Sequence, residues 1–166
     1  MKNIGIKFSF RMFINHFNIQ EENKTKIIAE EISKICKKGD VLAISGNMGV
    51  GKTTFIKYFI QKITKAKSVP SPSYNIILPY ESKYSNIFHM DAWRLKNHNE
   101  ALSLGITEMF DEAIFLIEWA EKIKVILPNN CLKILIKTTK NKKFMKIEGN
   151  EAWSKRFKKI KNYEKH

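Results

Sequence analysis

The chain has 166 residues, enough for one domain with a sizeable core, and its hydrophobic content of 43% and charged content of 28% are ordinary for a globular protein. No apolar run approaches the roughly 18 residues that cross a membrane, and Lys7, Arg11 and Asn15 interrupt the first apolar stretch, which argues against a signal-peptide core. The net charge of +14 suggests contact with RNA only weakly, because of the 30 basic residues only Arg11, Arg94 and Arg156 are arginine.

A strand near residues 7–17 is the first predicted element, and Asn18 is the predicted cap of a helix that runs to Gly39. The two acids at 21–22 suit the first turn of this helix, since carboxylates are favourable at its positive end. The apolar run at 41–44 then predicts a buried strand.

The segment Gly46–Thr53 follows that strand and opens a helix predicted to run to Lys65. Its glycines and its Gly-Lys-Thr ending have the spacing of a phosphate-binding loop, in which backbone N–H groups surround an anion at a helix N-terminus. Lys52 is expected to reach the β- and γ-phosphates of a nucleotide, and Thr53 to place its hydroxyl on Mg²⁺. The predicted nucleotide-binding residues are Gly46, Asn47, Met48, Gly49, Val50, Gly51, Lys52, Thr53 and Thr54.

The middle of the chain is predicted to alternate between loops and short regular elements. Residues 68–74 form a stiff loop, because they include two prolines and three serines. Strands are expected at 75–78 and 86–90 with a hairpin turn at 79–83 between them, followed by a helix at 99–104.

The second half is predicted to hold a central strand at 113–117, a helical or irregular segment at 119–126, strands at 132–138 and 144–147, and a basic helix at 151–162. This alternation of strands and helices predicts an α/β fold. We expect one domain over residues 1–150 and a basic helix or tail over 151–166. Cys36 and Cys131 lack metal-ligand spacing and are expected to be reduced, small hydrophobic residues of a cytoplasmic protein.

Two acids stand where a phosphate loop needs a carboxylate to complete a Mg²⁺ shell. Glu118 follows the strand at 113–117, and Asp91 follows the strand at 86–90. Strand ends of this kind face the crevice where ligands bind in open α/β sheets. Each acid taken alone has the alternative interpretation of a strand-end carboxylate that is exposed to solvent. We favour Glu118 as the metal-shell residue, with Asp91 either in a water-mediated metal contact or positioning the attacking water. Lys52, Asp91 and Glu118 are therefore the predicted catalytic residues.

Other polar residues near these acids have two interpretations each. The hydroxyls of Ser71-Pro72-Ser73-Tyr74 either sense the γ-phosphate as a switch or belong to a plain surface turn. His89 shares a strand face with Asp91 and is either a structural hydrogen-bonding residue or a catalytic one. Arg94 either stabilises charge on a transferring phosphoryl group or is a surface arginine.

Taken together and in order, these motifs resemble one family, the TsaE (also called YjeE) ATPases of bacterial tRNA threonylcarbamoyladenosine synthesis. The resemblance covers roughly residues 20–140 and rests on the phosphate loop with Gly49 and Gly51, Ser71-Pro72-Ser73-Tyr74, His89-Met90-Asp91-Ala92-Trp93-Arg94-Leu95, Leu104-Gly105-Ile106 and Ile117-Glu118-Trp119. Two positions depart from the family, which usually has Thr at Ser73 and Tyr at Trp93, so the latter change removes a phenolic hydroxyl.

The resemblance implies a P-loop NTPase-like three-layer sandwich with a central, mostly parallel (mixed) sheet flanked by helices. It also implies that the chain binds ATP and Mg²⁺, hydrolyses ATP slowly, and docks on a TsaB–TsaD complex in the cytoplasm, with tRNA reached through that complex. By matching positions, Thr53 and Glu118 resemble metal-shell residues and Lys52 the phosphate-binding lysine. Asp91 resembles the acid of the second switch segment, and Trp119 the aromatic neighbour of the metal acid.

Two other functions remain open from the residues alone. A small-molecule kinase is disfavoured because residues 50–150 contain only Arg94, whereas such kinases use several lid arginines. A nucleotide-dependent RNA-binding module without turnover is the other alternative.

For the basic tail, Trp153, Phe157 and Ile160 lie on one helical face that either packs on the domain or contacts tRNA or the partner complex.

Overall fold

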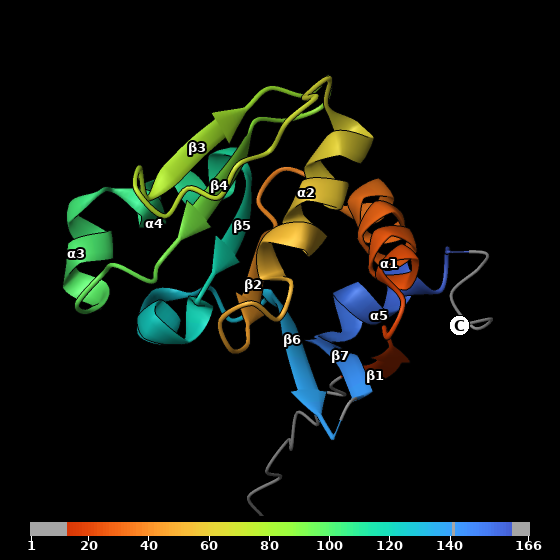
Figure 1. Cartoon of the computed structure of the whole chain (residues 1–166). Coiled ribbons are helices and arrows are strands. Elements are labelled where there is room, and N and C mark those ends of the chain that lie inside the picture. Colours follow the sequence, from red (N-terminus) through yellow and green to blue (C-terminus); the bar gives the residue numbers. More distant parts are fainter. Residues whose placement is uncertain (1–12, 141, 161–166) are drawn as a thin grey trace, which may run out of the picture.

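The computed structural model describes residues 13–140 and 142–160, which form a single seven-stranded sheet between two layers of helices (Figure 1). The strand order is β1-β7-β6-β2-β5-β4-β3. The four central strands, β6, β2, β5 and β4, run parallel, and β7, β1 and β3 pair antiparallel at the two sides. The strands are β1 (Phe13–Asn18), β2 (Val41–Ser45), β3 (Ile77–Tyr80), β4 (Ile87–Asp91), β5 (Ile114–Glu118), β6 (Leu132–Thr139) and β7 (Lys142–Gly149).

The helices divide between the two faces of this sheet. They are α1 (Glu22–Ile35), α2 (Lys52–Ile63), α3 (His98–Ser103), α4 (Ile106–Met109) and α5 (Glu151–Phe157), with 3₁₀ segments η1 (Phe110–Glu112) and η2 (Ala120–Ile126). One core cluster joins α1, α2 and α5 to the sheet, and a second joins α3, α4, η1 and η2 to its other face. The prediction of a three-layer α/β sandwich with a mixed sheet, parallel in its middle, is confirmed.

The centre of the sheet follows directly from sequence. All five residues of β5 are buried, as are the first four of β2, because helices cover both faces of these strands. Strands β2, β4 and β5 all end at the same edge, so the residues at their carboxyl ends come together there.

Two local predictions were wrong. Asn18 does not cap α1: it is the last residue of β1, and its Oδ1 accepts a hydrogen bond from the Gln20 N–H at 3.0 Å, so its side chain closes a local turn instead. Residues 79–80 are not part of the predicted hairpin turn but belong to β3. Pro79 is tolerated there because β3 is an edge strand.

The C-terminal helix α5 is shorter than predicted and packs on the domain. Asn150 Oδ1 caps it by accepting a hydrogen bond from the Trp153 N–H at 3.2 Å. The predicted apolar face of Trp153, Phe157 and Ile160 lies in the core, which favours packing on the domain over an exposed apolar contact. Residues 161–162 of the predicted helix, and 7–12 of the first predicted strand, lie outside the described residues.

The two cysteines are free, and burial raises the pKa of both thiols, which makes them weak nucleophiles. Within residues 13–140 and 142–160, every helix is too short or too polar to cross a bilayer.

Candidate functional site

The phosphate-loop segment connects the end of β2 to the start of α2 in close contact with β6. Gly46 has a φ of 143°, and a Cβ added there would lie 2.2 Å from the Ile136 carbonyl oxygen. Gly51 is the N-cap of α2 with a φ of 104°. Both positions therefore require glycine, one for the close approach of another strand and both for their backbone conformation.

Lys52 points back across the loop that it follows. Its Nζ donates to the carbonyl oxygens of Gly46 at 2.8 Å and Asn47 at 2.9 Å, and it lies 3.7 Å from the centroid of the Trp119 ring. Burial lowers the pKa of the Lys52 ammonium, while the carboxylates of Glu118, Glu121 and Asp91 oppose that lowering. The ammonium is thus held within the loop, close to the predicted acids.

Glu118 and Thr53 meet directly at this edge of the sheet. The Thr53 hydroxyl lies 2.8 and 2.9 Å from the two Glu118 carboxylate oxygens, and the Glu118 residue is only 3% exposed. A hydroxyl and a carboxylate side by side are oxygen ligands of the kind that Mg²⁺ prefers. Among the described residues no cluster of three or more His, Cys, Asp or Glu side chains could hold a metal, so further ligands would come from phosphate and water.

His89 holds the other side of Glu118. Its Nε2 lies 2.9 Å from Glu118 Oε1, and the imidazole is fully buried. The ring Nδ1 has no hydrogen-bond partner in the part of the chain that the structure describes. Sequence reasoning placed His89 on the face of Asp91 but did not identify this contact, since the sequence does not show which strands are neighbours. The contact follows from the parallel pairing of β4 with β5.

Asp91 lies opposite Glu118 in the register of β4 and β5. Its Oδ2 accepts a hydrogen bond from the Ser73 hydroxyl at 2.5 Å, and its Oδ1 accepts one from the Trp93 N–H at 2.8 Å. Ser73 in turn shares a 2.8 Å hydrogen bond with Ser71. The predicted switch loop is therefore tied to Asp91 through its hydroxyls, and not only a turn at the surface.

Aromatic residues close the site beside Lys52. Trp119 has a φ of 55° and packs on Trp93 with ring centroids 4.4 Å apart. Trp93 is 43% exposed, and Lys122 donates a hydrogen bond to its carbonyl oxygen. The Arg94 guanidinium stacks over the exposed Tyr74 ring, 4.5 Å from its centroid. The Lys52 ammonium, the Trp119 ring and the Trp93 ring thus form a stack, and Trp93 is its solvent-exposed end.

A cleft of about 460 Å³ joins these features. It is lined by Met48, Gly49, Gly51, Lys52, Thr53, Thr54, Ser71, Ser73, Tyr74, Asp91, Trp93, Arg94, Glu118 and Trp119. The structure therefore brings the three predicted catalytic residues and both predicted metal-shell residues to one cleft. Of the other predicted nucleotide-binding residues, Gly46, Asn47 and Val50 do not line it.

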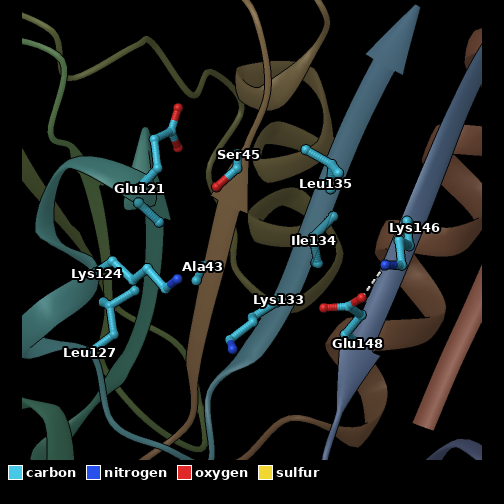
Figure 2. Close-up of a pocket in the computed structure, with 11 residues that line it drawn as sticks. Ala43, Ser45, Glu121, Lys124, Leu127, Lys133, Ile134, Leu135, Lys146 and Glu148 are labelled. Atoms are coloured by element: carbon cyan, nitrogen blue, oxygen red, sulfur yellow. Dashed lines mark ion pairs between the residues drawn. The ribbon is translucent and has the colours of Figure 1, made fainter. Parts of the chain in front are cut away.

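A second cavity, of about 280 Å³, lies between η2 and strands β2, β6 and β7 (Figure 2). Figure 2 shows Lys124 of η2 facing Ala43, and an ion pair between Lys146 and Glu148 of β7. None of the residues that line this cavity belongs to Gly46–Thr54. The cleft beside Lys52 is therefore the candidate functional site.

A family model described as "Threonylcarbamoyl adenosine biosynthesis protein TsaE" matches residues 19–147, which include every residue of the cleft. The chain belongs to the TsaE family. A TsaE protein of Bacillus subtilis is 38% identical over 115 residues, covering 69% of this chain and 72% of that protein. A TsaE protein of Rickettsia bellii is 34% identical over 123 residues, covering 72% of this chain and 83% of its own. Both are named tRNA threonylcarbamoyladenosine biosynthesis proteins.

The similarity in fold to a solved structure covers more of the chain than the sequence matches do. The crystal structure of YdiB from Bacillus subtilis superposes with a TM-score of 0.73 at 25% identity, covering 93% of this chain and 97% of YdiB. The resemblance predicted from the motifs is therefore confirmed as family membership, and the fold predicted from it is confirmed as well.

Proposed function

We propose that the chain binds ATP with Mg²⁺ and hydrolyses it as an accessory protein in the synthesis of tRNA threonylcarbamoyladenosine. The contact of Thr53 with Glu118, at 2.8 and 2.9 Å, is the observation that carries the chemical part of this proposal. It couples the end of a phosphate-binding loop to a buried carboxylate, as metal-dependent nucleotide hydrolysis requires. The names of its TsaE relatives support the tRNA modification.

The predicted catalytic and metal-shell residues each have a role in this proposal. Lys52 leaves the Gly46 and Asn47 carbonyls to bind the β- and γ-phosphates. Thr53 and Glu118 hold Mg²⁺, which when bound would neutralise charge on the β- and γ-phosphate oxygens. Asp91 orients the attacking water or contacts the metal through water. Release of its bond to Ser73 would let the switch loop respond to the γ-phosphate.

We further propose that turnover is slow until a TsaB–TsaD complex is bound in the cytoplasm, with tRNA reached through that complex. Residues 50–150 contain one arginine, Arg94, and it stacks on Tyr74 at the rim of the cleft. Among the residues that line the cleft only Lys52 and Arg94 are basic, so the isolated cleft has little positive charge to stabilise a transferring phosphoryl group. The same scarcity of arginine disfavours a small-molecule kinase.

Measurements of ATP binding and phosphate release on Lys52→Ala and Glu118→Ala test the proposal. We expect Lys52→Ala to weaken ATP binding about tenfold or more, because a charge-assisted contact to phosphate is lost. Glu118→Ala should keep binding within a few-fold and lower turnover by about 100-fold or more, because the metal shell is incomplete. Equal loss of binding in both variants would count against the role of Glu118. Wild-type protein that binds ATP without releasing phosphate, even with TsaB and TsaD, would indicate an RNA-binding module without turnover.

A further inference from the structure

Lys122 of η2 does not line the cleft, but it holds Trp93, which does. The Lys122 ammonium lies 5.2 Å from the centroid of the Trp93 ring and donates a hydrogen bond to the carbonyl oxygen of the same residue. The Trp93 N–H donates to Asp91 Oδ1 at 2.8 Å. Trp93 is thus held through its N–H, its carbonyl and its ring, although it is 43% exposed.

The Trp93 ring in turn supports the ring of Trp119. The two ring centroids are 4.4 Å apart, which is close enough for a stabilising aromatic contact. Trp119 has a φ of 55°, in the left-handed region, which is unfavourable for a residue with a large side chain and requires support from its surroundings. The Lys122 N–H donates to the Trp119 carbonyl oxygen at 3.0 Å. Lys122 therefore contacts both tryptophans, one through its ammonium and the other through its backbone.

The Trp119 ring contacts the ammonium of Lys52. The Lys52 Nζ lies 3.7 Å from the centroid of this ring, and it also donates to two carbonyl oxygens of the phosphate-loop segment. A cation is attracted to the face of an indole, and more strongly where water is excluded. Lys52 is only 4% exposed, so this attraction is strong here. The position of the Trp119 ring therefore affects where the ammonium lies.

We propose that Trp93 and Lys122 are positioning residues for Lys52, and that they act through the Trp119 ring. They keep this ring against the ammonium, which holds the ammonium within the loop that the phosphates enter and lowers the entropy cost of binding them. This proposal rests on the proposed function, since it assumes that Lys52 binds the phosphates of a nucleotide. It gives a role in nucleotide binding to Lys122, which lies outside the motifs that carry the family resemblance.

Titration calorimetry of the full-length chain with ADP tests the proposal. We expect Trp93→Ala to weaken ADP binding about fivefold, because the aromatic contact that holds Trp119 is lost. Trp93→Tyr keeps a ring at this position and should bind within about twofold of the wild type. Lys122→Met should weaken binding about threefold, because it removes the ammonium that holds Trp93. The matched control is Lys124→Met, which removes another exposed lysine of η2, one that faces Ala43 in the second cavity (Figure 2), and should bind as the wild type does.

A double-mutant cycle separates the positioning of Lys52 from a general effect on the fold. If Trp93 acts through Lys52, adding Trp93→Ala to Lys52→Ala should change the affinity for ADP by less than about twofold, because the ammonium that is positioned is absent. A further fivefold loss in the double variant would overturn the proposal. Thermal unfolding shows whether each variant is folded, and Lys122→Met keeps the test decisive if Trp93→Ala is not.

The outcomes also distinguish this inference from the function on which it rests. Wild-type protein that binds neither ADP nor ATP would reject the proposed function. Wild-type binding that Lys52→Ala weakens, together with unchanged binding in Trp93→Ala and Lys122→Met, would overturn the positioning role and leave the function standing.

Discussion

Glu118 is held from two directions by groups on different elements. The Thr53 hydroxyl approaches from α2, and His89 approaches from the neighbouring strand β4. A carboxylate in its ionised form only accepts hydrogen bonds, so His89 holds that form of Glu118 by donating from Nε2. The imidazole is fully buried, so it cannot turn away into solvent. His89 is therefore a positioning residue for Glu118.

Substitution of His89 should change the requirement for Mg²⁺ more than the affinity for the nucleotide alone. Loss of a residue that orients a metal ligand typically costs about 10- to 100-fold in metal affinity. We expect His89→Ala to raise the Mg²⁺ concentration that half-saturates ATP hydrolysis by about tenfold. His89→Gln, whose amide can still donate to Glu118, should require nearly the same Mg²⁺ concentration as the wild type.

The measurement is a Mg²⁺ titration of phosphate release at saturating ATP, with calorimetry of ADP binding in the absence of Mg²⁺ as the control. An unchanged Mg²⁺ requirement in His89→Ala would show that Thr53 alone is enough to orient Glu118. A fall in both Mg²⁺ and ADP affinity would instead indicate general damage to the cleft.

At the scale of single elements, α5 is a structural part of the domain although it lies beyond the family match at residue 147. The Trp153 indole N–H donates to the Asn130 carbonyl oxygen at 2.8 Å, and the residue is 1% exposed. Arg156 of the same helix pairs with the buried Asp40 through its two terminal guanidinium nitrogens, at 2.5 and 3.1 Å. The basic tail thus begins as an anchored helix.

We expect Trp153→Ala to lower the free energy of unfolding by about 3–5 kcal/mol, because a large buried side chain leaves a cavity. Urea unfolding followed by circular dichroism measures the change, and Lys159→Ala on the exposed side of the same segment is the control. If the two variants unfold at the same urea concentration, α5 does not contribute to the core in solution.

Sequence patterns predicted the elements whose signals are local. The centre of the sheet could be predicted from the apolar runs of β2 and β5, and the phosphate loop from the glycine spacing before Lys52. Asn18 was misassigned because an Asn side chain closes a turn as readily as it caps a helix. The contact of His89 with Glu118 could not be predicted, because it depends on the order of strands in the sheet.

At the scale of the whole molecule, the parallel middle of the sheet is what assembles the site. Strands β2, β5 and β4 are neighbours, so the phosphate loop, Glu118 and Asp91 follow from three strands that end at one edge. The stack of Trp119 and Trp93 leads from Lys52 to the surface, where a partner can reach it. This arrangement is consistent with the proposed ATPase activity and its proposed control by a partner protein.

The most direct test of this account is the yield of threonylcarbamoyladenosine in tRNA, measured by mass spectrometry in a reconstituted reaction. The reaction contains TsaB and TsaD from the same genome, a threonylcarbamoyl donor, tRNA and ATP. We predict several modified tRNAs per TsaD when the wild-type chain is present, and no more than about one when it is absent or replaced by Lys52→Ala. Equal yields with the wild-type chain, with Lys52→Ala and without the chain would contradict the account.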